Sequence, residues 1–386
     1  MDKWNMVKLS DVFTLQMGKT PSRNNPDYWN GNHKWLSIAD FGMNGKYINK
    51  TKECITDAAV AESGIKATPH NTVVMSFKLS IGKTAITVKD IFTNEAIMSF
   101  IDKGTYPIDV NYIYHLFSGK DWSKGTNKAV MGTTLNKATL SQITIPLPPI
   151  ETQHQIADNL EKVSKLIDIC NTILNKLDIL VKSRFVEMFG NPITNSHNLP
   201  LKMLSELGEL GRGISKHRPR NAPELLGGVY PLIQTGDVAN ASLYILDYNS
   251  TYSETGFKQS KMWSKGTLCI TIAANIAKTA ILTFDSCFPD SVVGFNANVS
   301  TNNIFIHFWF SFFQEILEEQ APESAQKNIN LKILSELKVI VPPIELQQQF
   351  ADFVAQTDKS KYCLVGEQIL GKAEMLIELL NQEYFG

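Results

Sequence analysis

Apolar residues recur at every third or fourth position through one long stretch of the chain. Eight such positions follow two adjacent prolines and alternate steps of four and three, namely Ile156, Leu160, Val163, Ile167, Cys170, Leu174, Leu177 and Val181. This spacing is typical of a helix that packs against another helix in a coiled coil. The pattern therefore predicts a long helix over residues 148–190, ending at Gly190, where glycine suits a helix C-terminus.

The beginning of this stretch occurs a second time near the C-terminus. Residues 148–158 read PPIETQHQIAD and residues 342–352 read PPIELQQQFAD, so eight of the eleven positions are identical. Other matches lie at nearly the same offset, among them IGKTAI at residues 81–86 and IAKTAI at residues 276–281. The chain therefore consists of two copies of one module, and a second long helix is predicted over residues 342–386.

Short β-branched runs separated by turns dominate the part of each module that precedes its helix. The runs at residues 72–77 and 84–88 return in the second copy at residues 267–272 and 279–284. Runs of this length and composition are typical of strands in a sheet. Each module is thus expected to begin with a globular, sheet-containing domain.

A polar segment rich in Gly, Pro and Asn opens each of these globular parts. The two opening segments cover residues 18–34 and residues 211–228. Their length and composition predict loops and not regular elements. Loops often carry binding residues, although a solvated surface loop without a partner is the alternative.

These patterns together predict an α+β fold with two tandem mixed-sheet domains, each followed by a long helix. The domains are expected at residues 1–147 and 201–341, and their helices at 148–190 and 342–386. The ten residues 191–200 contain two prolines and no Lys, Arg, Asp or Glu, which predicts a linker.

Composition and charge limit the class of protein. The 37 basic and 38 acidic residues give a net charge of −1, so the chain has no overall basicity that would indicate a nucleic-acid partner. The most apolar run, IFIHFWFSFF at residues 304–313, is about half of the ~20 residues that span a membrane, and predicts a buried helix. Five cysteines without a CxxC pair, and an N-terminus without an apolar core, predict reduced thiols in a cytoplasmic protein.

Catalytic and metal-binding motifs are weakly represented. The nearest string to the Asn-Pro-Pro-aromatic motif of base-amino methyltransferases is NPIT at residues 191–194, in the linker. A metal-dependent nuclease motif would need the widely separated PD at 289–290 and ELK at 336–338, and such short patterns arise often by chance. His115 and His307 occupy matching positions in apolar stretches, which favours structural, partly buried histidines. The residues themselves predict no catalytic site.

Basic residues are the candidates for binding. They lie in the two opening segments or just before an equivalent strand in each copy, where Lys or Arg at a surface would suit phosphate contacts and bidentate Arg would suit guanine edges. A cluster of solvated charges is the alternative. The candidate DNA-binding residues are Lys19, Arg23, Lys34, Lys83, Arg212, Lys216, Arg218, Arg220 and Lys278.

The whole chain resembles the specificity subunits of type I restriction-modification systems. That family commonly has Pro-Pro-x-x-Glu-Gln before each helix, where this chain has PPIETQ and PPIELQ. The resemblance is carried by the IGKTAI strand pair and by GKTPSRNNPDYWNGNHKWLSIADF at residues 18–41, TLNKATLSQITIPLPPIETQHQIA at 134–157 and INLKILSELKVIVPPIELQQQFA at 329–351.

The resemblance implies a non-catalytic subunit that reads DNA. Its two helices would pair as an antiparallel coiled coil, and its two target-recognition domains would each read one half of a split, asymmetric site in double-stranded DNA. Two modification (methyltransferase) subunits would supply adenine methylation from S-adenosylmethionine. Restriction (translocase/endonuclease) subunits, where present, would use ATP and magnesium, so no cofactor and no membrane is expected for this chain.

Two other functions compete with this interpretation. A duplicated coiled-coil scaffold that binds only proteins would share the helices and the repeat but lack DNA specificity. A self-contained restriction or modification enzyme would need the catalytic and cofactor motifs that the sequence lacks.

Overall fold

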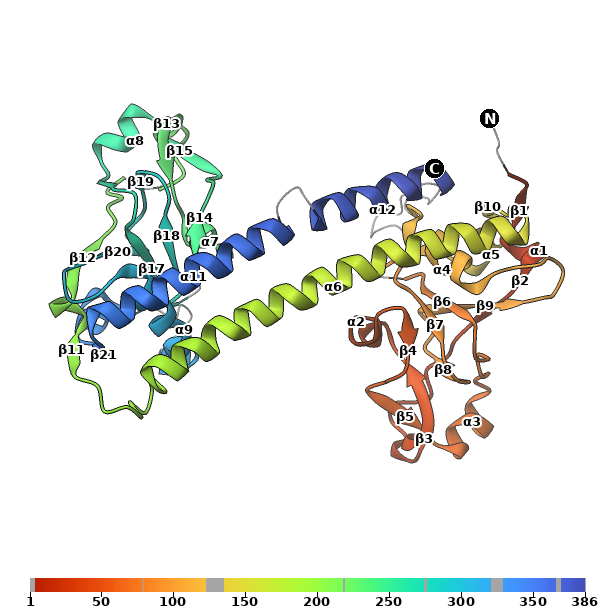
Figure 1. Ribbon diagram of the computed structural model, residues 1–386. Helices are drawn as coiled ribbons and strands as arrows, with labels where there is room; N and C mark the ends of the chain where they lie inside the picture. Colours follow the sequence, from red (N-terminus) through yellow and green to blue (C-terminus); the bar gives the residue numbers. More distant parts are fainter. Residues whose placement is uncertain are drawn as a thin grey trace. The chain divides into compact units, whose positions relative to one another are not determined.

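The computed structural model describes residues 4–78, 80–122, 135–217, 219–273, 276–320, 329–365 and 369–385. The chain divides into two compact units. Unit 1 contains Met1–Asn171 with Val365–Gly386, and unit 2 contains Thr172–Leu364. The long helix α6 (Ile150–Phe189) contributes residues to both units (Figure 1). None of the helices in the described ranges has an apolar stretch long enough to cross a lipid bilayer.

A five-stranded mixed sheet forms the centre of unit 1. Its neighbouring strands pair antiparallel except at one edge, where β4 runs parallel to β7. The helix α4 (Val110–Gly119) packs against β6 and β7 and buries Tyr112, Ile113, Leu116 and Phe117. In order across the sheet, the strands are β2 (Phe13–Met17), β9 (Ile97–Asp102), β6 (Val73–Ser76), β7 (Thr84–Thr87) and β4 (Tyr47–Ile48).

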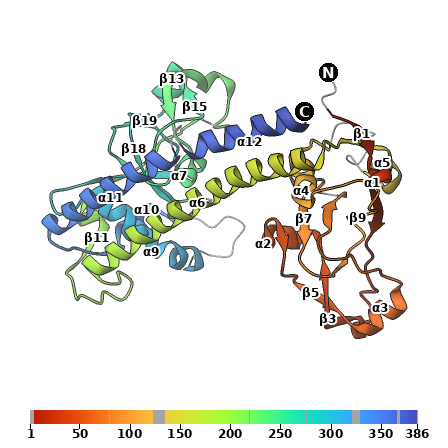
Figure 2. The ribbon, with the colours of Figure 1, turned by 45° about the vertical axis from the view of Figure 1, so that its right-hand side comes forward.

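A smaller sheet with order β5-β3-β8 forms a separate part of unit 1. We call this sheet, with the helix α3 and the 3₁₀ turn η1, the distal lobe of unit 1, because Figures 1 and 2 show β3, β5 and α3 on the far side of the five-stranded sheet from α6. The lobe has its own core around Trp35 and Ile55. Its elements are η1 (Pro26–Tyr28), β3 (Trp29–Leu36), β5 (Glu53–Ile55), α3 (Asp57–Ser63) and β8 (Phe92–Thr93).

Unit 2 repeats this arrangement. Its five-stranded sheet has the equivalent strand order, again with one parallel edge pair, β14 with β18. In order, these strands are β12 (Gly208–Arg212), β20 (Val292–Ala297), β17 (Leu268–Thr271), β18 (Thr279–Leu282) and β14 (Tyr244–Ile245). The distal lobe of unit 2 contains η4 (Pro223–Leu225), β13 (Leu226–Leu232), β15 (Ser250–Tyr252), α8 (Glu254–Lys258), β16 (Met262–Trp263) and β19 (Ser286–Cys287).

Short antiparallel pairs tie the beginning of each module to the segment that leads into its helix. In unit 1, β1 (Met6–Lys8) pairs with β10 (Thr144–Pro146), and in unit 2, β11 (Leu201–Met203) pairs with β21 (Lys338–Ile340). The remaining short elements are α1 (Leu9–Val12), η2 (Ile38–Asp40), α2 (Phe41–Asn44), α5 (Lys137–Gln142), η3 (Leu204–Glu206), α7 (Thr235–Asn240) and α10 (Leu331–Ser335).

The predicted heptad seam is the packing face of α6, since every one of its eight positions is buried or half-buried. In unit 2 the seam residue Val181 shares a core with Phe350 and Val354 of α11 (Ile344–Val365). In unit 1 the seam residue Leu160 shares a core with residues of α12 (Leu370–Phe385). The first turns of α6 therefore pack in one core with α12, and its last turns pack in another core with α11. The helices run antiparallel in each unit.

Two predictions about particular segments are settled by the structure. The apolar run at 304–313 lies in the helix α9 (Asn303–Gln320), with Phe305 and Ile306 fully buried, as expected. The expectation that both opening segments are loops throughout was wrong. A 3₁₀ turn capped by Asn25 leads directly into β3, and β12 and β13 extend into the second segment.

Candidate DNA interface

Hydrogen bonds hold the first opening segment in a fixed shape at the edge of the distal lobe. The side chain of Asn25 accepts from the backbone N–H of Asp27 (3.1 Å). The hydroxyl of Thr56, which caps α3, donates to the carbonyl oxygen of Asp27 (2.7 Å). The segment is thus part of the folded lobe, and its cations have defined positions.

Arg23 is engaged within the lobe. Its guanidinium forms a two-point pair with the carboxylate of Glu53 on β5, with 2.9 Å between Nη2 and Oε2. The same group lies over the ring of Trp29, 3.8 Å from its centroid. The pair lowers the pKa of Glu53, which therefore stays charged beside Arg23. Arg23 therefore links β3 to β5, although its side chain remains about half exposed.

The other two cations of this segment also have partners within unit 1. The Lys19 ammonium donates to the carbonyl oxygen of Ser63 at the end of α3. The Lys34 ammonium donates to the carbonyl oxygen of Asn49, and Lys34 lies in β3 and not in a loop. Both lysines are therefore held by backbone carbonyl groups and not by carboxylates.

Three basic residues of the second copy lie near one another in sequence but differ in their contacts. Arg212 donates from Nε to the backbone oxygen of Asp290, and Arg220 pairs with the carboxylate of the same residue. Lys216 is exposed, and its ammonium forms no hydrogen bond or ion pair within the described part of the chain. The predicted candidate Arg218 lies outside the described residues.

Lys83 and Lys278 occupy equivalent turns, each just before a strand, as the repeat predicts. The backbone N–H of Lys83 donates to the Ser76 hydroxyl (3.1 Å), and that of Lys278 donates to the Thr271 hydroxyl (3.1 Å). Their surroundings differ, since Lys83 is exposed whereas Lys278 lines a cavity of about 430 Å³ in unit 2. Neither residue belongs to a distal lobe, so within each unit the described candidates are not all in its distal lobe.

Two lysines of the first distal lobe were missed by the sequence analysis. Lys52 directly precedes β5 and Lys66 follows α3, and both are exposed. At the offset of 197 that joins Thr56 to Ser253, the counterpart of Lys52 is Asn249, whereas at the offset of 195 that joins β6 to β17 the counterpart of Lys66 is the exposed Lys261. Neither lysine lies in an opening segment or in the repeated strings IGKTAI and IAKTAI, the two places where the sequence indicates binding.

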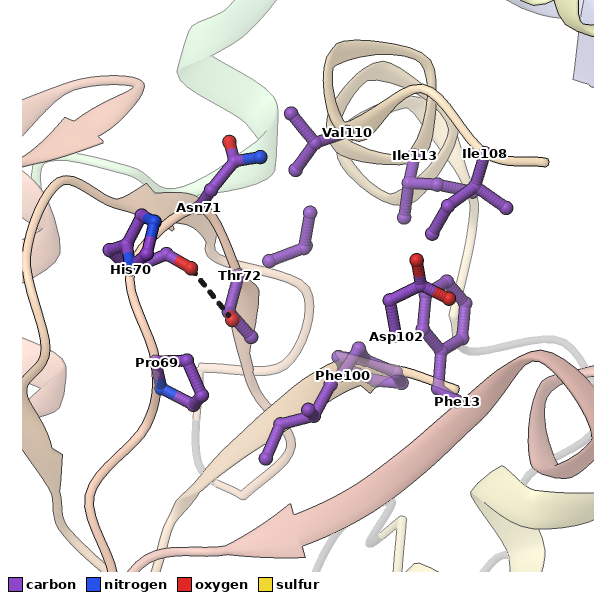
Figure 3. A pocket seen from close by; sticks show the side chains of 12 residues that line it. Phe13, Pro69, His70, Asn71, Thr72, Phe100, Asp102, Ile108, Val110 and Ile113 are labelled. Atoms are coloured by element: carbon purple, nitrogen blue, oxygen red, sulfur yellow. Dashed lines mark hydrogen bonds between the residues drawn. The ribbon is translucent and has the colours of Figure 1, made fainter. Parts of the chain in front are cut away.

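A cavity of about 340 Å³ in unit 1 lacks the arrangement of a catalytic site (Figure 3). Its walls are formed by β2, β9, α4 and the segment that leads into β6, and they combine apolar side chains with polar groups. His70 and Asp102 are ionisable groups in its lining, and Figure 3 shows them on opposite sides of the cavity. They are therefore not placed as a base and its orienting carboxylate, which would have to share a hydrogen bond.

A metal ion would require several ligand side chains close together in space. Among the described residues, no three His, Cys, Asp or Glu side chains gather in one place. Of the residues in the weak nuclease pattern, Asp290 pairs with Arg220, and Glu336 lies at the C-terminal end of α10. Asp290 is thus engaged in an ion pair, and the exposed Glu336 lies 4.0 Å from Lys332.

The two equivalent histidines are buried structural residues, as predicted. His307 on α9 is hydrogen-bonded through Nδ1 to the hydroxyl of Thr279 (3.0 Å), and His115 on α4 lies 3.6 Å from the carboxylate of Glu161. Burial, which disfavours the charged form, lowers the pKa of each to about 4. Both are therefore neutral at pH 7.

We expect these histidines to make the protein less stable in mild acid. In the unfolded chain a histidine gains its proton near pH 6.5, whereas in the folded chain it gains it near pH 4, so stability is lost as pH falls between these values. Each shift corresponds to about 3 kcal/mol at its full extent. His307→Gln should lessen the loss of stability between pH 7 and pH 4.5, measured by urea unfolding.

The exposed His70 offers a control for this measurement. His70→Gln should leave the free energy of unfolding at pH 7 nearly unchanged, because the His70 side chain is 73% exposed. An unchanged pH dependence in the His307 variant would contradict the assignment of His307 as a buried neutral histidine.

Comparison with known proteins identifies the family. A family model described as type I restriction modification DNA specificity domain matches residues 1–178 and 202–370. The chain belongs to this family. The two matches of the DNA specificity domain each contain one five-stranded sheet and one distal lobe, so the sequence repeat and the family division agree.

Several specificity proteins are similar to the chain over about half of its length. The MjaIX type I restriction enzyme specificity subunit of Methanocaldococcus jannaschii is 30% identical over 192 residues, which are 48% of this chain and 44% of that protein. The EcoprrI specificity subunit of Escherichia coli is 26% identical over 178 residues, covering 45% and 42% of the two chains. The chain thus aligns with less than half the length of these two relatives.

Solved structures share the fold of this specificity-domain chain over its whole length. An S subunit of a type I restriction-modification system from M. genitalium superimposes with a TM-score of 0.59 and 15% identity, covering 100% of this chain and 96% of that one. A chain from a study of complex assembly and conformational transition of the type I R-M system gives 0.62 and 14%, covering 99% and 97%. The tandem arrangement of two mixed-sheet domains and long helices is therefore the arrangement of known S subunits.

Proposed function

We propose that the chain is the DNA-reading specificity subunit of a type I restriction-modification complex and has no catalysis of its own. The observation that carries this proposal is that each unit has its own distal lobe and its own match to the DNA specificity family. Each unit would read one half of a split site in double-stranded DNA, in the cytoplasm.

Differences between the two units support an asymmetric target. The strand order is the same in both, whereas the exposed basic residues differ, since Lys52 of unit 1 has Asn249 as its counterpart in unit 2. Lysines in such positions would contact phosphates and set the position of each unit on the duplex, while other side chains would select bases.

Apolar side chains exposed on the helices support docking of partner subunits. On α6, Ile179 is 63% exposed, and on α12, Met375 is 61% exposed. We propose that two modification subunits dock on the helices and bring S-adenosylmethionine for adenine methylation. Restriction subunits would bring ATP and magnesium, and this chain would bind none of these cofactors.

The test is to sequence the methylome of cells that express this chain with its modification subunit. We expect one methylated motif with two specified halves separated by unspecified base pairs. Exchanging residues 1–147 for those of another specificity subunit should alter one half and keep the other. Methylation that does not depend on this chain would overturn the proposal, and binding to partner subunits without any DNA preference would favour the protein scaffold.

We expect Lys216→Ala to weaken DNA binding at low salt without altering the motif. A lysine that neutralises one phosphate contributes about 0.9 to the slope of log affinity against log salt, so the slope should become shallower by about one. The measurement is affinity at several salt concentrations for the complex with its modification subunits. Lys332→Ala, on α10, is the control, and equal slopes for the two variants would contradict a phosphate contact by Lys216.

A further inference from the structure

The strand β3 carries a bulge at the tip of the first distal lobe. Trp29 and His33 are both in register with the same residue of β5, Ile55, so residues 30–32 are looped out of the ladder. Asn30 has a positive φ of 63°. A Cβ on Gly31 would lie 2.4 Å from the carbonyl oxygen of Ile55, which only glycine avoids.

Unit 2 has the same bulge in β13. Leu226 and Tyr230 are both in register with Tyr252, so residues 227–229 are looped out. Gly227 has a φ of 83°, and a Cβ on Gly228 would lie 2.4 Å from the carbonyl oxygen of Tyr252. The two bulges therefore match in length, in backbone conformation and in the position of the central glycine.

Equivalent hydrogen bonds fix the base of each bulge. In unit 1, the N–H of Thr56 donates to the carbonyl oxygen of Tyr28 (3.1 Å), next to the bond from its hydroxyl to Asp27. In unit 2, Ser253 donates from its N–H to Leu225 (2.8 Å) and from its hydroxyl to Glu224 (2.6 Å). The frame that supports the bulge is thus the same in both copies.

The side chains at the tip of the bulge differ between the copies. Unit 1 presents Asn30 and Asn32, which are exposed and form no side-chain hydrogen bond within the described part of the chain. Unit 2 presents Gly227 and Val229, and Val229 is 81% exposed. The equivalent bulges thus present an exposed valine in one unit and two exposed asparagine side chains in the other. Packing within the chain does not explain these side chains.

The chemistry of these side chains suits base edges in the major groove. The groove admits a two-stranded β-ribbon, asparagine can make a two-point contact with adenine, and an apolar group can contact the thymine methyl. Bulges commonly redirect side chains next to functional sites. By contrast, Arg23 is paired with Glu53, and Arg220 is paired with Asp290. Such ion-paired arginines suit a role in positioning the lobe.

We propose that the tips of the β3 and β13 bulges read bases, with Asn30 and Asn32 selecting in one half-site and Val229 in the other. This inference rests on the proposed function. Two units that read different half-sites would share the same backbone structure and differ in the exposed side chains that contact bases. The bulge tips are exposed positions that meet both conditions.

The test exchanges the tip residues between the units. Asn30→Gly with Asn32→Val gives unit 1 the tip of unit 2, and Gly227→Asn with Val229→Asn does the reverse. The backbone tolerates both, because asparagine accepts a positive φ and the space around Gly227 is open. Each variant is expressed with the modification subunit, and the methylome is sequenced. The control is Asn71→Gly, which changes an exposed asparagine with φ 53° in the turn before β6.

We expect each exchange to change or relax the preference at one or two positions of one half-site. Methylation of the original half-site should fall about 5- to 150-fold, as for loss of a good base contact. The other half-site and the number of unspecified base pairs should stay as in the wild type. The Asn71→Gly control should methylate the wild-type motif. If an exchange abolishes methylation, DNA affinity is measured on duplexes in which each base pair of the site is changed in turn. An altered preference at one position supports the inference. Equal weakening on all duplexes overturns it.

Failure of this inference is distinguishable from failure of the proposed function. If both exchange variants methylate the original motif fully, the bulges do not read bases. The proposed function would still hold in that case, because the split motif would still depend on the chain. A wild-type chain that directs no motif would overturn the proposed function itself.

Discussion

Replacing Phe185 by alanine should lower the free energy of unfolding of unit 2 by about 4 kcal/mol. The side chain is fully buried where α6, α9 and α11 meet. Its ring centroid lies between 5.0 and 5.4 Å from those of four other aromatic rings, on Phe189, Phe305, Phe312 and Phe350. Alanine would leave a cavity among rigid rings that cannot close around it, so the lost contacts are not replaced.

Hydrogen exchange of the full chain, combined with urea unfolding, would measure this effect. Amide protection should fall in the sheet of unit 2 and remain in the sheet of unit 1. Val186→Ala is the control, because Val186 is the next residue of α6 and is 38% exposed, so its loss should cost under 1 kcal/mol. A comparable effect of the two substitutions would mean that Phe185 does not join the helices of unit 2.

The long helix could be predicted from sequence because one local pattern determines it. The spacing from Ile156 to Val181 specifies a single packing face over seven turns, and two prolines before it and Gly190 after it mark both ends. The helix α6 covers Ile150–Phe189, in agreement with the predicted range of 148–190. The strands β6, β7, β17 and β18 could be predicted for the same reason, as short β-branched runs bounded by turns.

The partner of each part of that helix could not be predicted from spacing. The last residues of the chain, in α12, belong to unit 1, where Phe385 packs edge-on against Tyr112 of α4. Thr357 and Lys361 interrupt the apolar pattern of α11, yet Thr357 is buried, and Lys361 pairs with Asp178 of α6 (2.6 Å). A polar contact of this kind depends on a residue far away in sequence and leaves no periodic signal.

The candidate site shows the same limit. Lysine and arginine in a polar segment predict a cationic surface. Whether each charge can contact DNA depends on the side chains that lie next to it in space. Glu53 is 30 residues from Arg23, and Asp290 is 70 residues from Arg220. The bulges could not be predicted, because Gly31 and Gly228 lie in polar, glycine-rich segments, where glycine is expected without any close approach to a strand.

The glutamine that both helix motifs share, Gln153 and Gln347, should be essential for joining each helix to its domain. Gln347 is fully buried. Its Oε1 accepts from the Thr301 hydroxyl (2.8 Å), and its Nε2 donates to the carbonyl oxygens of Ser300 (3.1 Å) and Pro342 (2.8 Å). One amide therefore connects the first turn of α11 to the loop before α9.

Gln153 makes the corresponding contacts in unit 1. Its Oε1 accepts from the N–H of Asp109 (2.9 Å), and its Nε2 donates to the carbonyl oxygens of Pro107 (3.0 Å) and Pro148 (2.9 Å). The repeated Gln of PPIETQ and PPIELQ thus has one structural role in both copies. It satisfies backbone groups that would otherwise be buried without partners.

We expect Gln347→Leu to destabilise unit 2 by about 3 kcal/mol, because leucine fills the space but leaves a hydroxyl and two carbonyl groups buried without hydrogen bonds. Gln348→Leu is the control, since Gln348 is exposed and its side chain bonds, within the described part of the chain, only to Asp352 (3.0 Å). Urea unfolding followed by hydrogen exchange should place the loss for Gln347→Leu in α9 and α11. Gln153→Leu should produce the same loss in α4 and the first turns of α6. Equal stability of the Gln347 and Gln348 variants would show that water or a shifted backbone replaces these hydrogen bonds, and the shared glutamine would then not be what fixes the helix to its domain.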